Sequence, residues 1–176
     1  MTIATHYFPH YTIADYEQWQ GDWELWAGYP VAMTPSPSFD HQQALSNLLF
    51  AIKTSLQNIN TCHCQAVVEV DWRIAEDTVV RPDVMVVCEP IKTKWVEITP
   101  SLIAEVLSPS TRNNDLTFKK SLYAEQGVTY SLIVDPTEEQ SETLHWADGQ
   151  YEPAESTPLT LHEGCALSLD LSAIWA

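Results

Sequence analysis

The chain has 176 residues, a formal net charge of −16 and 45% hydrophobic residues. This composition can bury a core, which excludes a disordered chain, and the length suits one domain spanning residues 1–176. The acidic balance argues against non-specific nucleic-acid binding, and because no run of about 18 apolar residues occurs, no membrane span is expected.

The first third of the chain predicts a short helix, a hairpin and a long helix. The motif Thr12-Ile13-Ala14-Asp15 is typical of a capping box that begins a short helix. Apolar runs at residues 23–26 and 29–33 predict a hairpin, which a turn at residues 34–37 follows. Ser38 is expected to cap a long amphipathic helix. Its apolar residues at near-helical spacing are Phe39, Leu45, Leu48, Leu49, Ile52 and Leu56.

The middle of the chain predicts β structure. Residues 66–74 and 79–88 are rich in β-forming side chains, and Ala75-Glu76-Asp77 separates them. This pattern predicts a hairpin that leads into a central strand. Residues 95–100 form a connector, and the apolar run of residues 102–107 predicts the next buried strand.

One further helix is expected to connect two neighbouring strands. Residues 108–111 interrupt the preceding strand, and Asn113 or Asn114 can cap a helix that runs to about Gln126, with Gly127 just beyond its end. A strand at residues 128–134 should follow. The remainder predicts short antiparallel strands, with turns at Gly149 and Gly164 and a final helical turn near residues 171–175. The order predicts an α/β (α+β) fold with a mixed sheet.

Two acidic residues lie in or beside runs that predict buried strands. Asp83 follows Arg81-Pro82 and precedes an apolar run, and Glu105 lies inside the run of residues 101–107. An unpaired ionised group is costly in such a place, and two carboxylates on adjacent strands could hold Mg²⁺. Two other interpretations stay open: Asp83 could be an ordinary turn residue, and Glu105 could face water on an edge strand.

The predicted helix contributes a lysine to the same region. Lys119 shares the apolar face with Leu116, Leu122 and Tyr123, whereas Lys120 is one position away and should point outward. An inward lysine could orient an attacking water or offset charge in a transition state. It could instead extend its ammonium to solvent or pair with Asp115 at i, i+4.

The cysteines predict reduced thiols and a cytoplasmic location. Cys62 and Cys64 are one residue apart, so they do not form a zinc-type C-x₂-C pair, and no second pair exists. His63 between them does not improve the spacing. The start of the chain lacks a charged segment followed by an apolar one, so no secretion signal is expected.

At these residues the chain resembles the Uma2 (DUF820) family, which is abundant in cyanobacteria and belongs to the restriction-endonuclease-like PD-(D/E)XK superfamily. The resemblance covers most of the chain between Trp19 and Pro136. Residues 105–111 with the downstream Asp115, Lys119 and Tyr123 are its specific part. The matching stretches are residues 23–28, 31–35, 79–84, 105–111, 115–119, 122–123, 127–128 and 133–136.

The resemblance implies a restriction-endonuclease-like mixed sheet flanked by helices, and hydrolysis of phosphodiester bonds, with DNA as the substrate and Mg²⁺ or Mn²⁺ as the cofactor. It implies that Asp83 and Glu105 bind the metal. The superfamily usually places its lysine two residues after the acid, where this chain has Leu107, and Lys119 matches a lysine moved onto the following helix. Glu24 matches an additional acid of the family, and His41 matches a helix histidine that faces the site.

The chain departs from the family pattern twice. Tyr29 follows Gly28 where the family usually has glutamate, which removes one acid near the hairpin. Tyr130-Ser131 replaces a Tyr-Trp pair.

Two other functions fit parts of the sequence. A catalytically inactive nuclease-fold domain, acting as a homodimeric or protein-binding module, suits the charge of −16, which would repel DNA. However, all eight Lys and Arg residues lie between Lys53 and Lys120, the segment that contains the candidate site. A glycosidase-type carboxylate pair fits the acids but leaves Lys119 without a role. A homodimer is expected from fold analogy and the tryptophan-rich ends.

Overall fold

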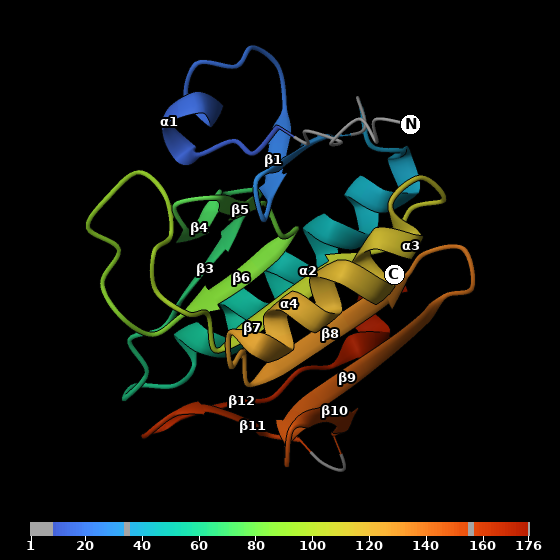
Figure 1. The fold of residues 1–176 in the computed structure, drawn as a ribbon. Helices are drawn as coiled ribbons and strands as arrows, with labels where there is room; N and C mark the ends of the chain where they lie inside the picture. Colours follow the sequence, from blue (N-terminus) through green and yellow to red (C-terminus); the bar gives the residue numbers. More distant parts are fainter. Residues whose placement is uncertain (1–8, 34–35, 155–156, 176) are drawn as a thin grey trace, which may run out of the picture.

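The computed structural model describes residues 9–33, 36–154 and 157–175. Its largest sheet has six strands in the order β10-β9-β8-β7-β6-β3 (Figure 1). They are Gln65–Val68 (β3), Val84–Val87 (β6), Leu102–Val106 (β7), Tyr130–Asp135 (β8), Gln140–Ala147 (β9) and Gln150–Pro153 (β10). Only β7 and β8 pair in parallel, so this large sheet is mixed, as the sequence predicted.

A small sheet packs beside one end of the large one and has the order β2-β1-β5-β4. Its strands are Trp23–Trp26 (β1), Tyr29–Ala32 (β2), Trp72–Ala75 (β4) and Thr78–Val80 (β5). A two-stranded sheet, Leu159–His162 (β11) and Cys165–Leu167 (β12), and a 3₁₀ turn at Leu171–Trp175 (η2) complete the described part, as expected.

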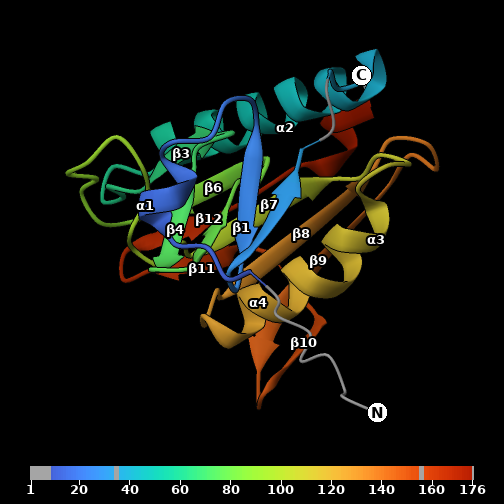
Figure 2. The same cartoon turned by 45° about the horizontal axis from the view of Figure 1, so that its top comes forward.

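Two helical layers cover the large sheet (Figures 1 and 2). Phe39–Gln57 (α2) covers one face, and a second helical unit covers the other. This unit, called the site helix below, consists of Arg112–Asn114 (α3), the π-helical turn Asp115–Lys119 (η1) and Lys120–Glu125 (α4). Alternating strand residues divide the core accordingly: Val84 and Val86 pack toward α2, whereas Met85 and Val87 pack toward the site helix.

The helix ends follow the predicted local chemistry. Ile13–Tyr16 (α1) begins with the expected capping box, in which the Asp15 carboxylate accepts hydrogen bonds from the Thr12 N–H and hydroxyl. Ser38 caps α2 by accepting the His41 N–H. Gly127 has φ +73° just after the site helix. The predicted turn at residues 34–37 begins at Thr34 and Pro35, which lie outside the described residues.

The two long β segments differ from the prediction. Each is divided into two short strands, so β4 and β5 pair in the small sheet while β3 and β6 pair in the large one. Glu69, with φ +49°, marks one break, and Pro82, which has no N–H to donate to a ladder, marks the other. The second break places Asp83 where the two sheets meet.

Two residues predicted to face inward are exposed. Phe39 is 79% exposed and Leu116 is 36% exposed. The buried face of the site helix carries Lys119, Leu122 and Tyr123, as predicted, and also Asp115, four residues before Lys119. The prediction followed apolar residues alone and therefore passed over the aspartate. The site helix also begins at Arg112, slightly before the two asparagines expected to cap it.

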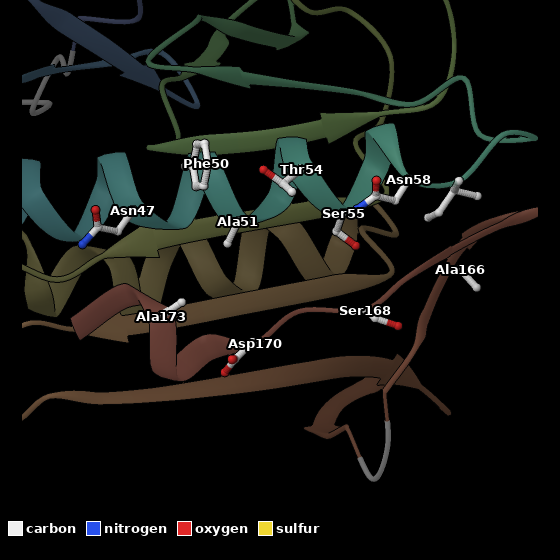
Figure 3. Close-up of a pocket in the computed structure, with 11 residues that line it drawn as sticks. Asn47, Phe50, Ala51, Thr54, Ser55, Asn58, Ala166, Ser168, Asp170 and Ala173 are labelled. Carbon is white, nitrogen blue, oxygen red and sulfur yellow. The ribbon is translucent and has the colours of Figure 1, made fainter. Parts of the chain in front are cut away.

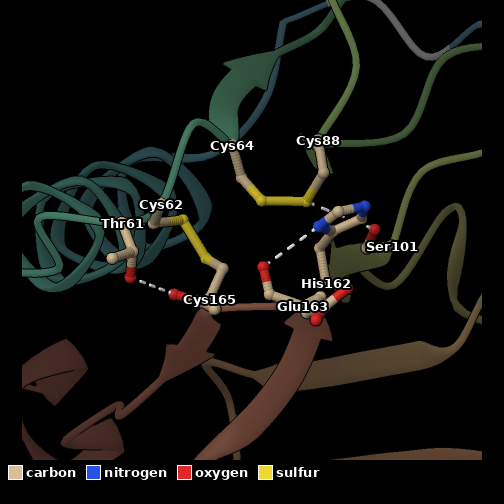
Figure 4. Close-up of a disulfide and its surroundings, with 9 residues drawn as sticks. Thr61, Cys62, Cys64, Cys88, Ser101, His162, Glu163 and Cys165 are labelled. Carbon is tan, nitrogen blue, oxygen red and sulfur yellow. Dashed lines mark hydrogen bonds between the residues drawn. A yellow bond between two sulfur atoms is a disulfide. The ribbon is translucent and has the colours of Figure 1, made fainter.

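The expectation of reduced thiols is wrong in this structure. Cys62 is bonded to Cys165, and Cys64 to Cys88 (Figure 4), so no cysteine of the described residues is free. These partners lie 103 and 24 residues apart, which local spacing could not reveal. The prediction that no segment spans a membrane agrees with the helices: along the described chain, none has an apolar stretch that could cross a bilayer.

Candidate functional site

A cavity of about 460 Å³ lies where the small sheet, the start of α2 and the site helix meet. Side chains from separate elements line it, and they include every residue that the sequence proposed for function. These residues are Glu24 of β1, His41 of α2, Asp83 before β6, Glu105 of β7 and Lys119 of η1. The fold thus brings all five to one place, and the cavity also contains Asp115 and Arg81.

Strand register explains why Asp83 and Glu105 meet. β6 and β7 are antiparallel, with Val84 opposite Ala104, so continuing the register places Asp83 opposite Glu105 on the face of the site helix. Asp83 Oδ2 accepts the Val106 N–H at 2.7 Å, and Glu105 Oε2 lies 3.4 Å from the Asp83 N–H that donates to it. The cross-strand bonds therefore fix both carboxylates at the same edge of the cavity.

Lys119 lies among three buried carboxylates. Its Nζ is 3.3 Å from Glu24 Oε1, 3.3 Å from Glu105 Oε1 and 3.4 Å from Asp115 Oδ1. Burial alone would lower the pKa of the ammonium, but the neighbouring carboxylates outweigh it and raise this pKa above its ordinary value. Lys119 is therefore a permanent cation at neutral pH.

Tyr123 does not line the cavity but fixes the position of Glu105. Its hydroxyl donates to Glu105 Oε1 at 2.5 Å, and both side chains are buried. Burial raises the pKa of the Glu105 carboxyl well above its ordinary value, although the Lys119 charge acts in the opposite direction. Burial and the Glu105 charge also raise the pKa of Tyr123, so the phenol stays a hydrogen-bond donor.

Asp115 is a site residue for which no catalytic or metal-binding role was predicted, although it belongs to the matching stretch of the family. The i, i+4 spacing to Lys119 was visible, but it predicted a weak surface pair, whereas Asp115 is only 2% exposed. Burial raises the pKa of its carboxyl in spite of the Lys119 charge. Asp115 Oδ1 has the Lys119 ammonium at 3.4 Å as its ionic partner, so Asp115 adds a third buried carboxylate around this cation.

Glu24 and His41 support the central residues. Glu24 Oε1 accepts the Arg81 N–H at 2.6 Å and Glu24 Oε2 accepts the Trp26 indole N–H at 3.0 Å, so both oxygens are held. His41 Nε2 lies 3.4 Å from Asp83 Oδ2. Burial opposes protonation of His41, but the Asp83 carboxylate prevails and raises the pKa of the imidazole.

The donor set fits a hard divalent cation. Four carboxylates (Glu24, Asp83, Glu105 and Asp115) line the cavity with the single buried ammonium of Lys119, and carboxylate oxygens are the ligands that Mg²⁺ and Mn²⁺ prefer. Within the described ranges these oxygens do not form a group of three within 4.8 Å of one another. The arrangement therefore suits an ion held by one or two carboxylates, with water and substrate oxygens as its other ligands.

The hydrogen bond of Tyr123 gives a first prediction. Tyr123→Phe should lower the free energy of unfolding by about 1–3 kcal/mol, because it leaves a fully buried carboxyl oxygen of Glu105 without this donor. Urea denaturation measures this change. Tyr130→Phe is a matched control, since the buried Tyr130 hydroxyl accepts only the Thr160 N–H, and its loss should cost about 0.5–1.5 kcal/mol. Equal losses in the two variants would contradict a special role for Tyr123.

Comparison with known proteins identifies the family and the fold of the chain. The Uma2 family model, described as "Putative restriction endonuclease", matches residues 13–173. A solved structure from Anabaena variabilis ATCC 29413, described as "a putative nuclease belonging to DUF820", superposes with a TM-score of 0.72 and 15% sequence identity, covering 94% of this chain and 97% of the other. At this identity the likeness shows a shared fold. None of the curated proteins matches the chain.

Proposed function

Because the chain belongs to the Uma2 family of restriction-endonuclease-like proteins, we propose that it is a metal-dependent endonuclease that hydrolyses phosphodiester bonds in DNA. The observation that supports this proposal most is the meeting of Asp83, Glu105 and Lys119 in one cavity. Two acids and a lysine in one cavity supply what hydrolytic cleavage of a phosphodiester requires. The acids are ligands for a metal ion, and the lysine is a cation for the charge that develops.

Asp83 and Glu105 would hold Mg²⁺ or Mn²⁺, which when bound would polarise a phosphoryl oxygen and lower the pKa of a bound water. The chain's own groups prepare the site for this chemistry. The Val106 N–H and His41 fix Asp83, and Tyr123 fixes Glu105. With its charge stabilised, the Lys119 ammonium can donate to an attacking water or to a phosphate oxygen.

The position of the lysine fits this role. In the superfamily pattern it would stand at residue 107, and here that residue is the buried Leu107. Lys119 enters the site from the neighbouring helix instead, and its Nζ lies 3.3 Å from Glu105. An ammonium in this position lies beside the Glu105 carboxylate, whether a strand or a helix supplies the lysine.

Plasmid cleavage tests the proposed function. Asp83→Asn keeps the shape of the side chain but removes the charge of one metal ligand, so the cleavage rate in Mg²⁺ or Mn²⁺ should fall at least about 100-fold. Asp148→Asn, at an exposed turn, is the matched control and should cleave like the parent. Cleavage of equal rate by all three proteins, or cleavage that persists after chelation of the metal, would refute the proposal.

We also propose that the protein is a homodimer that associates through α2. Phe39 and Phe50 are 79% and 73% exposed, and because they are eleven residues apart, about three turns, they lie on the same side of the helix. Phe50 borders a groove of about 520 Å³ between α2 and the C-terminal segment (Figure 3). Exposed aromatic side chains of this size are typical of interfaces.

Light scattering after gel filtration tests the dimer. The parent should elute with twice the mass of one chain, and Phe50→Glu should elute as a monomer, because a charge in an apolar interface is not compensated. Gln140→Glu, an exposed change on β9 and so outside α2, should remain dimeric. A monomeric parent, or a dimeric Phe50→Glu variant, would exclude this interface.

A further inference from the structure

The four cysteines of the chain lie close together (Figure 4). None of them lines the carboxylate cavity. Cys62 and Cys64 follow α2, Cys88 follows β6, and Cys165 begins β12. The sulfur atoms of Cys62, Cys64 and Cys165 lie within 4.8 Å of one another, and that of Cys88 is bonded to Cys64. In the described ranges this is the only group of three or more metal-ligating side chains that is so compact.

The backbone holds these residues together independently of the sulfur–sulfur bonds. β3 and β6 pair with Gln65 opposite Val87, so the register places Cys64 opposite Cys88 at the end of the ladder. On the other side the Thr61 hydroxyl donates to the Gly164 carbonyl at 2.5 Å, next to Cys62 and Cys165. Reduction of the two bonds would therefore leave four thiols close together on a fixed framework.

We propose that in the reduced protein Cys62, Cys64, Cys88 and Cys165 bind one Zn²⁺ ion. Four thiolates from three segments of the chain are the donor set of structural zinc sites, in which sulfur surrounds the metal tetrahedrally. Soft sulfur ligands also distinguish this site from the carboxylate cavity, whose oxygen donors suit Mg²⁺. The Ser101 hydroxyl, 3.4 Å from the Cys88 sulfur, can donate to a thiolate and support the site from outside.

The change from the disulfide-bonded protein to the reduced, zinc-bound protein balances in electrons and protons. An external dithiol gives two electrons and two protons to each disulfide and becomes a disulfide itself, which leaves four thiols on the chain. When the thiols bind Zn²⁺ they release protons to solvent, because the thiolate is the ligand. The exchange begins at accessible sulfur: Cys62, Cys64 and Cys88 are half-buried, whereas Cys165 is only 2% exposed.

Cobalt titration of the full chain tests the site. The protein is reduced with a dithiol, freed of it without oxygen, and titrated with Co²⁺, which reports thiolate ligation by charge-transfer absorption in the near ultraviolet and tetrahedral geometry by bands in the red. We expect both features to saturate at about one ion per chain and to disappear when Zn²⁺ displaces the cobalt. The unreduced protein should show neither.

Variants separate this site from the proposed nuclease centre. Cys64→Ser and Cys165→Ser should each lose most of the charge-transfer absorption. Asp83→Asn should keep all of it, whether or not the protein cleaves DNA, so failure of one proposal does not affect the other. If a serine variant does not fold, the cobalt titration of the reduced parent alone tests the zinc site. Four titratable thiols in the parent without the cobalt bands, with the chain folded or unfolded, would overturn the zinc proposal.

Discussion

Replacement of Lys119 by methionine should lower the free energy of unfolding by about 3–5 kcal/mol. Methionine fills a similar volume, but it leaves Glu24, Glu105 and Asp115 buried together without their shared cation. Removal of one member of a buried ion network costs this much because the remaining charges are neither solvated nor paired. Urea denaturation at neutral pH, with the slope compared between variants, gives the value.

Lys120→Met is the matched control for this variant. Lys120 is the next residue, is half-buried and has no ion pair within the described residues, so its replacement should change stability by less than about 0.5 kcal/mol. The proposed metal site adds a second expectation. Mn²⁺ should restore part of the stability that Lys119→Met loses, because a cation that binds only the folded chain stabilises it. Equal effects of the two lysine variants would show that the ion network carries little energy.

Glu105→Gln should have the opposite profile, with a large loss of cleavage and no loss of stability. The glutamine amide oxygen can still accept the Tyr123 hydrogen bond, and only the long, 3.4 Å hydrogen bond from the Asp83 N–H is lost. The side chain no longer supplies an anionic metal ligand. The cleavage rate should fall at least about 100-fold, and calorimetric titration should show much weaker Mn²⁺ binding. Glu97→Gln, an exposed change, should alter neither quantity.

The sign of the stability change follows from the raised pKa of Glu105. A carboxyl whose pKa is higher in the folded chain than in the unfolded one holds its proton more tightly when folded, so the parent loses stability as pH rises from the unfolded to the folded pKa. Glutamine does not titrate. The variant should therefore be as stable as the parent, or more stable, at neutral pH, and this gain should vanish below the ordinary pKa of glutamate. If Glu105→Gln were less stable than the parent at neutral pH only, the argument that burial raises the pKa of Glu105 would be contradicted.

Local signals made much of the fold predictable. The capping box at Thr12, the cap at Ser38 and the glycine after the site helix depend on neighbouring residues only, and each is found where the sequence placed it. The division of the β segments and the pairing of the cysteines were not predictable in this way. Both depend on contacts between residues distant in sequence, as between Cys62 and Cys165.

The candidate site, like the fold, was predictable only in part from the sequence. The sequence indicated Asp83, Glu105 and Lys119, since charged residues next to buried runs are unusual, and the structure brings them into one cavity. It passed over Asp115, because an aspartate four residues before a lysine is also typical of an exposed helix face. Only the packing of the site helix against the large sheet distinguishes the two situations, and the π-helical turn at Asp115–Lys119 is a feature often found at functional sites.

The position of Glu24 links the candidate site to the cooperativity of unfolding. Glu24 belongs to the small sheet, yet it binds Lys119 of the layer that covers the large sheet. If the small sheet opened as a separate unit, the ammonium would lose a partner while most of the core stayed intact. Native-state hydrogen exchange should then find a partly open form in which the amides of β1 and β5 exchange before those of β7 and β8. Such a form would be folded by most optical measures and still lack a complete site.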